Sequence, residues 1–224
     1  MSEIVLILGG TKEAAELAVS LVAEHPDWRV ITSLAGRTRE PAPLAGETRI
    51  GGFGGADGLA EYLRTEGVTR LIDATHPFAR QISKNARLAT EKAGVPLETV
   101  TRPPWQKQPG DLWVEVNSLE KARDELPSGA RVLLALGSQH ISVFASRADV
   151  HFLVRMVDPP AEPLPLADHE LVIGKPGNVS EEKALLAAHR ISHIVSRNSG
   201  GAASYAKIEA ARQMGITVVM VERP

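Results

Sequence analysis

A histidine follows a short apolar run in the stretch LIDATHPFARQIS (71–83), where Asp-Ala-Thr leads into His76 and Pro77. Proline biases the residue before it toward an extended conformation and delays the start of the next helix. Thr75 and His76 are therefore expected to point from a strand end into a ligand site. Imidazole titrates near neutrality, so His76 could donate a proton or hold a carboxylate. The structural alternative is a histidine bonded to a neighbouring loop carbonyl.

A glycine pair follows the first apolar run, in the stretch ILGGTKEA (7–14) that opens a predicted helix. Glycines let a backbone approach a phosphate, and the free N–H groups of a helix start attract the anion. The match to G-x-G-x-x-G is incomplete, because the glycines are adjacent and Ala14 replaces the third one. Its place at the first strand–helix junction still favours a dinucleotide over a tight turn without ligand. The predicted cofactor contacts of this turn are Gly9, Gly10, Thr11, Lys12 and Glu13.

The type of dinucleotide is indicated at the end of the second predicted strand, in VITSLAGRTRE (30–40). NAD-binding units usually have Asp or Glu there, whereas this chain has Ser33, Gly36 and Arg37. A hydroxyl and a guanidinium suit a 2′-phosphate, so the predicted cofactor is NADPH. The alternative is a solvated loop with surface arginines. The remaining predicted cofactor contacts are Gly52 and, beside the nicotinamide, Thr75, His76 and Pro77.

Cationic and polar turns recur in the second half of the chain. SRNSGGAAS (196–204) is the counterpart of the histidine turn and could form a nest for an anion or an amide. TRPPWQKQ (101–108) has cations around Trp105, which suits a flat anionic ligand, although a structural tryptophan fits equally well. The predicted catalytic residues are His76 and Ser199, and the predicted substrate-binding residues are Arg102, Lys107, Ser138, Arg155, Arg197, Asn198, Ser199 and Lys207.

The elements that must position these residues alternate between apolar runs of strand length and segments of helical period. This alternation predicts an α/β fold with parallel sheets covered by helices. Asp57 and Ser180 are expected to cap the second helix and the first helix of the second half. The predicted strands are 3–8, 29–34, 69–74, 95–101, 130–137, 192–197 and 216–224, and the predicted helices are 11–25, 57–67, 78–94, 179–190 and 202–215.

The two halves of the chain resemble one another. LILGGTKE (6–13) is similar to LALGSQHI (134–141), and GVPLETVTRP (94–103) is similar to GITVVMVERP (215–224). Repeats of this kind predict two copies of one structural unit, although any two α/β units share the strand–helix rhythm.

The predicted fold is therefore two Rossmann-like lobes with parallel sheets and a cleft between them. The boundaries are 1–127 for an NADPH-binding lobe and 128–224 for a substrate-binding lobe. Ligands of such folds lie at the carboxyl ends of the strands, so both lobes should line the cleft. The proline-rich segment 158–170 is expected to be a surface loop, with a lid over the cleft as the alternative.

Composition excludes several classes of protein. The 224 residues are 43% hydrophobic and 23% charged with a net charge of -2, which argues against a nucleic-acid or membrane-surface role. The chain has no cysteine, which removes disulfides, thiolate metal sites and a cysteine nucleophile. His189 and His193 are spaced for a metal but lack an evident third ligand, so no metal is predicted. With no signal peptide or long apolar segment, the expected location is the cytoplasm.

The chain resembles the precorrin-6A reductase family of cobalamin biosynthesis over nearly its whole length. The motifs that carry the resemblance are ILGGTKEA, SLAGR, GGFGG, DATHPFA, TRPPW, LGSQHI, SRNSGG, KIEAA and VERP. The resemblance implies NADPH-dependent reduction of one double bond in a ring-contracted tetrapyrrole, from precorrin-6A to precorrin-6B. It leaves both the metal-free substrate and its cobalt-containing counterpart open.

The expected partners are the tetrapyrrole substrate and, among proteins, neighbouring enzymes of the pathway, with neither nucleic acid nor membrane. The substrate class carries many acetate and propionate arms, which suit a cationic site. Three alternatives remain: an NADPH reductase of another flat polycarboxylate, a non-catalytic NADP(H)-sensing module, and an S-adenosylmethionine methyltransferase. Only an enzyme for an anionic substrate needs the cationic turn of the second half.

Overall fold

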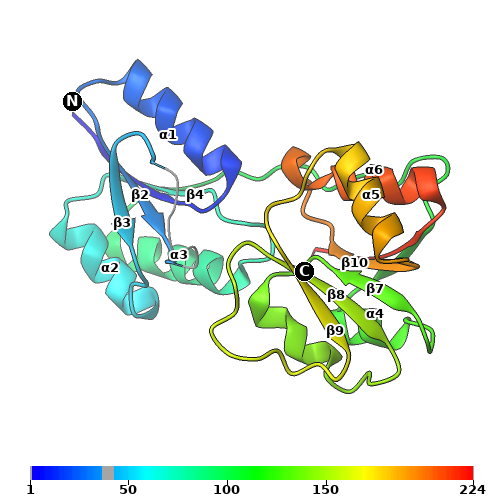
Figure 1. Ribbon diagram of the computed structural model, residues 1–224. Helices are drawn as coiled ribbons and strands as arrows, with labels where there is room; N and C mark the ends of the chain where they lie inside the picture. The colour runs from blue at the N-terminus through cyan, green and yellow to red at the C-terminus, as the bar shows by residue number, and fades with distance from the viewer. Residues whose placement is uncertain (1, 37–42, 224) are drawn as a thin grey trace. The chain divides into compact units, whose positions relative to one another are not determined.

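The chain forms two compact units, which the computed structural model describes for residues 2–36 and 43–223 (Figure 1). Unit 1 is Met1–Thr101 and unit 2 is Arg102–Pro224. The boundary thus falls before the predicted position at 127/128, because a strand at Trp113–Val116 joins the sheet of unit 2. In the described part of the chain, no helix has the length and apolar character to cross a membrane.

Unit 1 is built on a five-stranded sheet with the order β3-β2-β1-β4-β5, and every strand pair in it is parallel. The three central strands have four to six residues and are rich in Val, Ile and Leu, which agrees with the strands predicted at these positions. The elements in chain order are β1 (Ile4–Leu8), α1 (Lys12–Glu24), β2 (Arg29–Leu34), β3 (Glu47–Ile50), α2 (Gly55–Thr65), β4 (Arg70–Asp73), α3 (Arg80–Ala93) and β5 (Leu97–Thr99).

Helices cover both faces of this sheet. Side chains alternate along β1, so Leu6 and Leu8 pack with α2 and α3, whereas Val5 and Ile7 pack with Ala14 and other residues of α1. Figure 1 shows α1 apart from α2 and α3, which lie together. Both faces are therefore buried, which explains the continuous apolar sequence of β1.

Unit 2 has a six-stranded, all-parallel sheet with the order β6-β11-β10-β7-β8-β9. Apart from β6, this order repeats that of unit 1, so the predicted internal repeat is confirmed as a repeat of topology. The elements are β6 (Trp113–Val116), α4 (Leu119–Asp124), β7 (Arg131–Leu134), the 3-10 helix η1 (Ser138–Phe144), β8 (His151–Met156), β9 (His169–Ile173), α5 (Val179–Ala188), β10 (His193–Arg197), the 3-10 helix η2 (Ala202–Ser204), α6 (Ala206–Met214) and β11 (Thr217–Val221).

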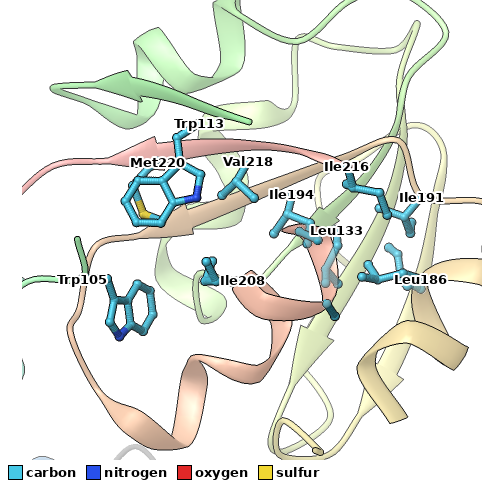
Figure 2. Packing of buried hydrophobic residues seen from close by; sticks show 13 residues of the cluster. Trp105, Trp113, Leu133, Leu186, Ile191, Ile194, Ile208, Ile216, Val218 and Met220 are labelled. Atoms are coloured by element: carbon cyan, nitrogen blue, oxygen red, sulfur yellow. The ribbon is translucent and has the colours of Figure 1, made fainter. Parts of the chain in front are cut away.

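One face of the second sheet packs against α5 and α6 (Figure 2). Leu133, Ile194 and Val218 from three strands meet Leu186 of α5 and Ile208 of α6, all of them at least nine-tenths buried. Burial of this apolar area is the main force that holds the helices on the sheet. The segment between β8 and β9 contains no helix or strand, and a lid function for it stays a prediction.

Two predicted helix caps are wrong. Helix α2 begins at Gly55 after the left-handed Gly54, and Asp57 lies in its first turn as an ion-pair partner of Lys92. Helix α5 is capped by Asn178, which accepts a hydrogen bond from the Glu181 N–H, and not by Ser180. In both cases a residue before the predicted one has the non-helical conformation that a cap requires.

Candidate functional sites at the two strand switch points

Each sheet has one point at which the chain connections leave in opposite directions. In unit 1 it lies between β1 and β4, and in unit 2 between β7 and β10. Loops after the carboxyl ends of two such strands diverge and leave room for a ligand. Some predicted site residues of each unit lie at these strand ends and others do not, and the two units are described separately.

Close packing at the glycine turn of unit 1 requires Gly9. Its N–H donates to the Ser33 carbonyl at 2.9 Å, which brings the turn against β2. A Cβ at Gly9 would be 2.8 Å from Cγ2 of Thr32, closer than real Cβ atoms approach other atoms. Gly10 has φ +101, a conformation that favours glycine. The turn therefore exposes backbone where a side chain would otherwise lie.

The hydroxyl of Thr11 is used within the protein. It accepts a hydrogen bond from the Ala14 N–H at 3.1 Å, which caps α1, and it donates to the Ala74 carbonyl at 2.8 Å. These bonds join the start of α1 to the end of β4. The predicted cofactor contact of Thr11 thus depends on its backbone. Lys12 pairs with Glu16 at 3.0 Å on the exposed side of the helix.

Arg49, a residue that the sequence analysis missed, lies beside Ser33. Its guanidinium donates to the hydroxyl of Ser33 at 3.4 Å and to the carbonyls of Gly51 at 2.5 Å and Gly52 at 2.9 Å. Its Cζ is 3.8 Å from the ring centroid of Phe53, which adds a cation–π contact. A cation is therefore fixed next to the hydroxyl that was expected to bind a 2′-phosphate.

Arg37, the cation that the sequence predicted for this position, lies outside the described residues, so its role stays a prediction. Gly36 is described and has φ +72, consistent with a turn directly after β2. Arg49 could have been found from the third strand, ETRIGG, in which it stands two positions before a glycine pair.

The turn after β4 orients His76. The Phe78 N–H donates to Nδ1 of His76 at 3.3 Å, so the neutral ring carries its proton on Nε2. Asp73 accepts bonds from the N–H of Thr75 at 3.1 Å and from its hydroxyl at 2.6 Å. Asp73 is 5% exposed, so this turn is tied to the buried end of β4. Pro77 follows, and α3 begins at Arg80, two residues after the predicted start at 78, so the delay of the helix after the proline is longer than expected.

Asn198 in unit 2 fastens the connector at Trp105. Its Oδ1 accepts from the Trp105 N–H at 2.7 Å, and its Nδ2 donates to the Trp105 carbonyl at 3.0 Å. Both sides of the amide are thus used, and the residue is 9% exposed. The amide of Asn198 therefore has a structural role, and its contact with a substrate stays a prediction. The alternative interpretation, in which Trp105 is a structural residue of the connector, agrees with its 9% exposure.

Two arginines hold the backbone of the same turn. Arg102 donates through Nε to the Ser199 carbonyl at 2.6 Å. Arg223 donates to the carbonyls of Asn198 and Ser199, at 3.0 Å each, and to that of Arg102 at 2.6 Å. Burial and the nearby charge of Arg102 lower the pKa of Arg223. Sequence reasoning missed Arg223 as a site residue, although it lies within the terminal VERP motif.

Two further predicted substrate contacts are an exposed lysine and a serine whose side chain the structure does not describe. Lys107 is exposed, and its Nζ donates to the Trp113 carbonyl at 3.2 Å. Ser138 begins η1, next to the left-handed Gly137, but its side chain lies outside the described part of the chain. Their roles toward a substrate stay predictions.

A buried charge cluster accounts for two more of the predicted cations. Arg155 and Glu182, 9% and 1% exposed, form an ion pair at 2.9 Å. Lys207 is 3% exposed and donates to the Ser204 carbonyl at 2.7 Å. Burial lowers the pKa of Lys207 to about 7, and the attraction of Glu182 opposes that shift. Arg155 and Lys207 are thus used within the protein core, and their contacts with a substrate stay predictions.

Arg197 is the predicted cation that reaches the switch point of unit 2. It is the last residue of β10, and its guanidinium donates to the Leu136 carbonyl at 3.0 Å and lies 3.2 Å from Nε2 of His140. Both side chains are half-buried. Sequence reasoning missed His140, although it belongs to the quoted LGSQHI motif. Among the described residues, no group of three or more His, Asp or Glu could hold a metal ion.

Comparison with known proteins identifies the family. A family model described as "Precorrin-6x reductase CbiJ/CobK" matches residues 4–224. The chain belongs to this family. The resemblance that the sequence motifs indicated is thereby confirmed.

Named members of the family are similar to the chain over almost its full length. A precorrin-6A reductase from Rhodococcus erythropolis is 45% identical, with 98% of this chain and 89% of that protein covered. One from Rhodobacter capsulatus is 46% identical, with 98% and 87% covered. A more distant relative, a cobalt-precorrin-6A reductase from Priestia megaterium, is 27% identical, with 98% and 90% covered.

A solved structure titled "CobK precorrin-6A reductase" is 46% identical and has a TM-score of 0.94, with 99% of this chain and 88% of that chain covered. The predicted α/β fold with two parallel sheets is confirmed by this likeness and by the strand pairing above.

Proposed function

We propose that the chain is an NADPH-dependent reductase that converts precorrin-6A to precorrin-6B by reducing one double bond of the macrocycle. The observation that carries the proposal is the full-length similarity to proteins named precorrin-6A reductase, together with the TM-score of 0.94 to a solved one. The two strand switch points, each surrounded by candidate site residues, are consistent with one site for a dinucleotide and one for a substrate.

The metal-free tetrapyrrole is the substrate that we favour. Relatives with 41–48% identity carry the name precorrin-6A reductase, whereas those named cobalt-precorrin-6A reductase are 24–28% identical. Enzymes at the higher identity usually keep the same substrate. The sequence motifs alone left this choice open.

The residues of unit 1 fit NADPH. At Gly9 a Cβ would collide with Thr32, and Gly10 has φ +101, so backbone rather than side chains faces the start of α1. A phosphate can approach such a turn and interact with the helix N-terminus. Ser33 and Arg49 offer a hydroxyl and a cation to a 2′-phosphate, a role that Arg49 would share with the predicted Arg37. NADPH, when bound, supplies a hydride.

The protein's own residues would orient the reactants and supply a proton. The Phe78 N–H bond to Nδ1 holds the His76 ring in its neutral form, with Nε2–H as a hydrogen-bond donor. His76 would become the proton donor only as the imidazolium, after it takes up a solvent proton at Nδ1 and this bond is released. Asp73 restrains the turn through Thr75 and thereby keeps the imidazole in one orientation. Ser199 stays the second candidate donor. The predicted cofactor contacts Lys12, Glu13, Gly52 and Pro77 remain part of the proposal.

The partners follow from the same proposal. The substrate is a tetrapyrrole with carboxylate arms, and neighbouring enzymes of the pathway are the proteins that would deliver it and take the product. A cytoplasmic location is part of the same proposal, since NADPH is a soluble cofactor that is available there.

The proposal is tested by anaerobic assays of the purified chain with NADPH or NADH and with metal-free or cobalt-containing precorrin-6A. We expect NADPH oxidation that matches the loss of the metal-free substrate one for one, with slower turnover of the cobalt form and of NADH. Binding of NADPH without oxidation would instead support a sensing module. Oxidation with a different flat polycarboxylate, but not with precorrin-6A, would support the alternative reductase.

A further inference from the structure

Strand β9 stands at one edge of the sheet of unit 2, next to β8 (Figure 1). It has five residues, whereas the other edge strands, β3, β5 and β6, have three or four. Leu171 and Ile173 of β9 are 42% and 48% exposed, and among the described edge-strand residues only Ile50 of β3 is another large apolar side chain of this kind. Proteins usually keep edge strands short or charged, because an apolar edge is a template for pairing with another chain.

The two exposed side chains of β9 point to the same face of the sheet. Side chains alternate along a strand, and Val172 between them packs against the core under α5 and α6. Leu171 and Ile173 therefore point to the opposite face. An apolar stripe thus runs along this face of β9 at the outer limit of the sheet.

The backbone groups of β9 alternate between β8 and the outer side. The Phe152 N–H donates to the Asp168 carbonyl at 3.1 Å, and the Gly174 N–H donates to the Met156 carbonyl at 2.8 Å. Even-numbered residues of β9 thus direct their N–H and carbonyl toward β8, and odd-numbered residues direct theirs outward. Within the described ranges, no further backbone group is bonded to the N–H or carbonyl of Leu171. The outer side of β9 therefore offers donors and acceptors to an additional strand.

Antiparallel pairing about a two-fold axis at Leu171 fits this edge. Leu171 of each copy would exchange both backbone hydrogen bonds with Leu171 of the other, and His169 would pair with Ile173. Aliphatic side chains then meet at the centre of the interface. Glu170 falls opposite Val172, so no acidic residue stands opposite another.

The charges at the two ends of the strand are complementary. Asp168 and Glu170 lie at its start, and the exposed Lys175 follows its end. In the antiparallel arrangement, Lys175 of one copy falls opposite Ala167 of the other, next to Asp168. A parallel arrangement would place like charges side by side and would not close on a two-fold axis. The edge is therefore complementary to itself in charge as well as in backbone pairing.

We propose that β9 is a self-association edge, through which two copies of this chain join their sheets of unit 2 across a two-fold axis at Leu171. The proposal does not depend on the proposed function, because it uses no cofactor or substrate contact. Five paired residues are fewer than the roughly 20–30 residues a side of a stable interface. The dimer should therefore be weak, with a dissociation constant of about 10–100 µM.

The first test is sedimentation equilibrium of the full chain from about 5 µM to about 500 µM. We expect mostly single chains at the lower concentration and mostly dimers at the higher one. A chain that remains monomeric at about 500 µM would overturn the proposal and leave the edge to a different partner.

Leu171→Lys places two ammonium groups opposite one another at the two-fold axis and removes the central apolar contact. It should weaken the dimer at least about 30-fold. Lys175→Glu should weaken it about 2-fold to 5-fold, as expected for an exposed ion pair. Leu88→Lys is the matched control, because Leu88 of α3 is 39% exposed and lies in unit 1, and it should associate like the wild type. Circular dichroism would verify that the variants are folded, and equal association of the wild type and Leu171→Lys would exclude this edge as the interface.

A second test locates the interface through the alternation of its backbone groups. Hydrogen exchange resolved to single amides should slow about 3-fold to 6-fold at His169, Leu171 and Ile173 between the two concentrations, in proportion to the loss of monomer. The amides of Glu170 and Val172, which face β8, should exchange equally at both concentrations. Uniform slowing along β9 would contradict edge pairing. Protection of the odd-numbered amides already in the monomer would mean that the chain itself covers this edge, and the proposal would be wrong.

Discussion

Replacement of Lys207 by methionine should change how the stability of unit 2 depends on pH. The side chain is 3% exposed, and burial lowers its pKa from 10.5 to about 7. Between these two values the unfolded chain binds a proton that the folded chain does not, so stability rises with pH across this window. Below pH 7 Lys207 is protonated in both the folded and the unfolded chain. The folded state then bears the full free-energy cost of burying the ammonium group. Methionine has a similar length and no charge.

The expected change in the free energy of unfolding follows from the shift in the pKa of Lys207. Each pH unit inside the window contributes about 1.4 kcal/mol, so the wild type should gain roughly 3 kcal/mol between pH 6 and pH 9 that Lys207→Met does not gain. The advantage of the variant over the wild type should therefore be roughly 3 kcal/mol larger at pH 6 than at pH 9. Lys207→Met keeps the Arg155–Glu182 ion pair, so the buried Glu182 still has a partner in the variant.

The assay is urea unfolding at both pH values, followed by the fluorescence of Trp105 and Trp113 in a Trp28→Phe background, so that the signal reports unit 2. Lys121→Met, at an exposed position of α4 in the same unit, is the control and should show the pH dependence of the wild type. Identical pH dependence of the wild type and Lys207→Met would refute the reasoning, because it would mean that Lys207 has the same pKa in both states.

Three further substitutions test other contacts. Arg49→Leu should weaken NADPH about 10-fold or more while NADH binding stays unchanged, measured by calorimetry at one salt concentration; equal loss for both would exclude a role at the 2′-phosphate. Thr11→Ala removes the cap of α1 and the bond to Ala74, so thermal unfolding should reveal a loss of about 1–2 kcal/mol, and an unchanged stability would contradict the capping role. Asn198→Ala leaves the buried Trp105 N–H and carbonyl without partners, which should cost about 2–4 kcal/mol in urea unfolding, whereas a near-neutral result would mean that water replaces the amide.

The parts of the fold that could be predicted from sequence are those with a local signal. The apolar runs at β1, β7 and β11 are buried on both faces and so are continuous in sequence. In contrast, β9 is a half-exposed edge strand that contains Glu170, and α4 has only six residues. Neither has the apolar periodicity that distinguishes an element from a loop.

The error in the unit boundary has a long-range cause. The repeat begins in unit 2 at β7, which suggested a boundary just before it. However, β6 precedes the repeat and adds to the sheet edge beside β11, a pairing between residues about 100 positions apart in sequence. No local pattern marks a strand as an addition to a distant edge.

The sequence indicates where the turns of the candidate site lie, but not which of their side chains hold the backbone. The strand-end turns at Gly9 and His76 follow from glycine, proline and apolar patterning. Whether a polar residue faces a ligand or holds the backbone depends on distant partners. Asn198 and Trp105 are separated by 93 positions, and only the folded chain reveals that the amide is used between them.

Transfer of deuterium from NADPH labelled at C4 of the nicotinamide to precorrin-6A is the measurement that most directly tests the central claim. The account predicts that one of the two possible C4 labels appears in the tetrapyrrole product, with a mass gain of one deuterium and one solvent proton. The deuterium at the other C4 position should remain in the oxidised cofactor. A reduced product that contains no deuterium from either label, or no reduced product at all, would contradict the account.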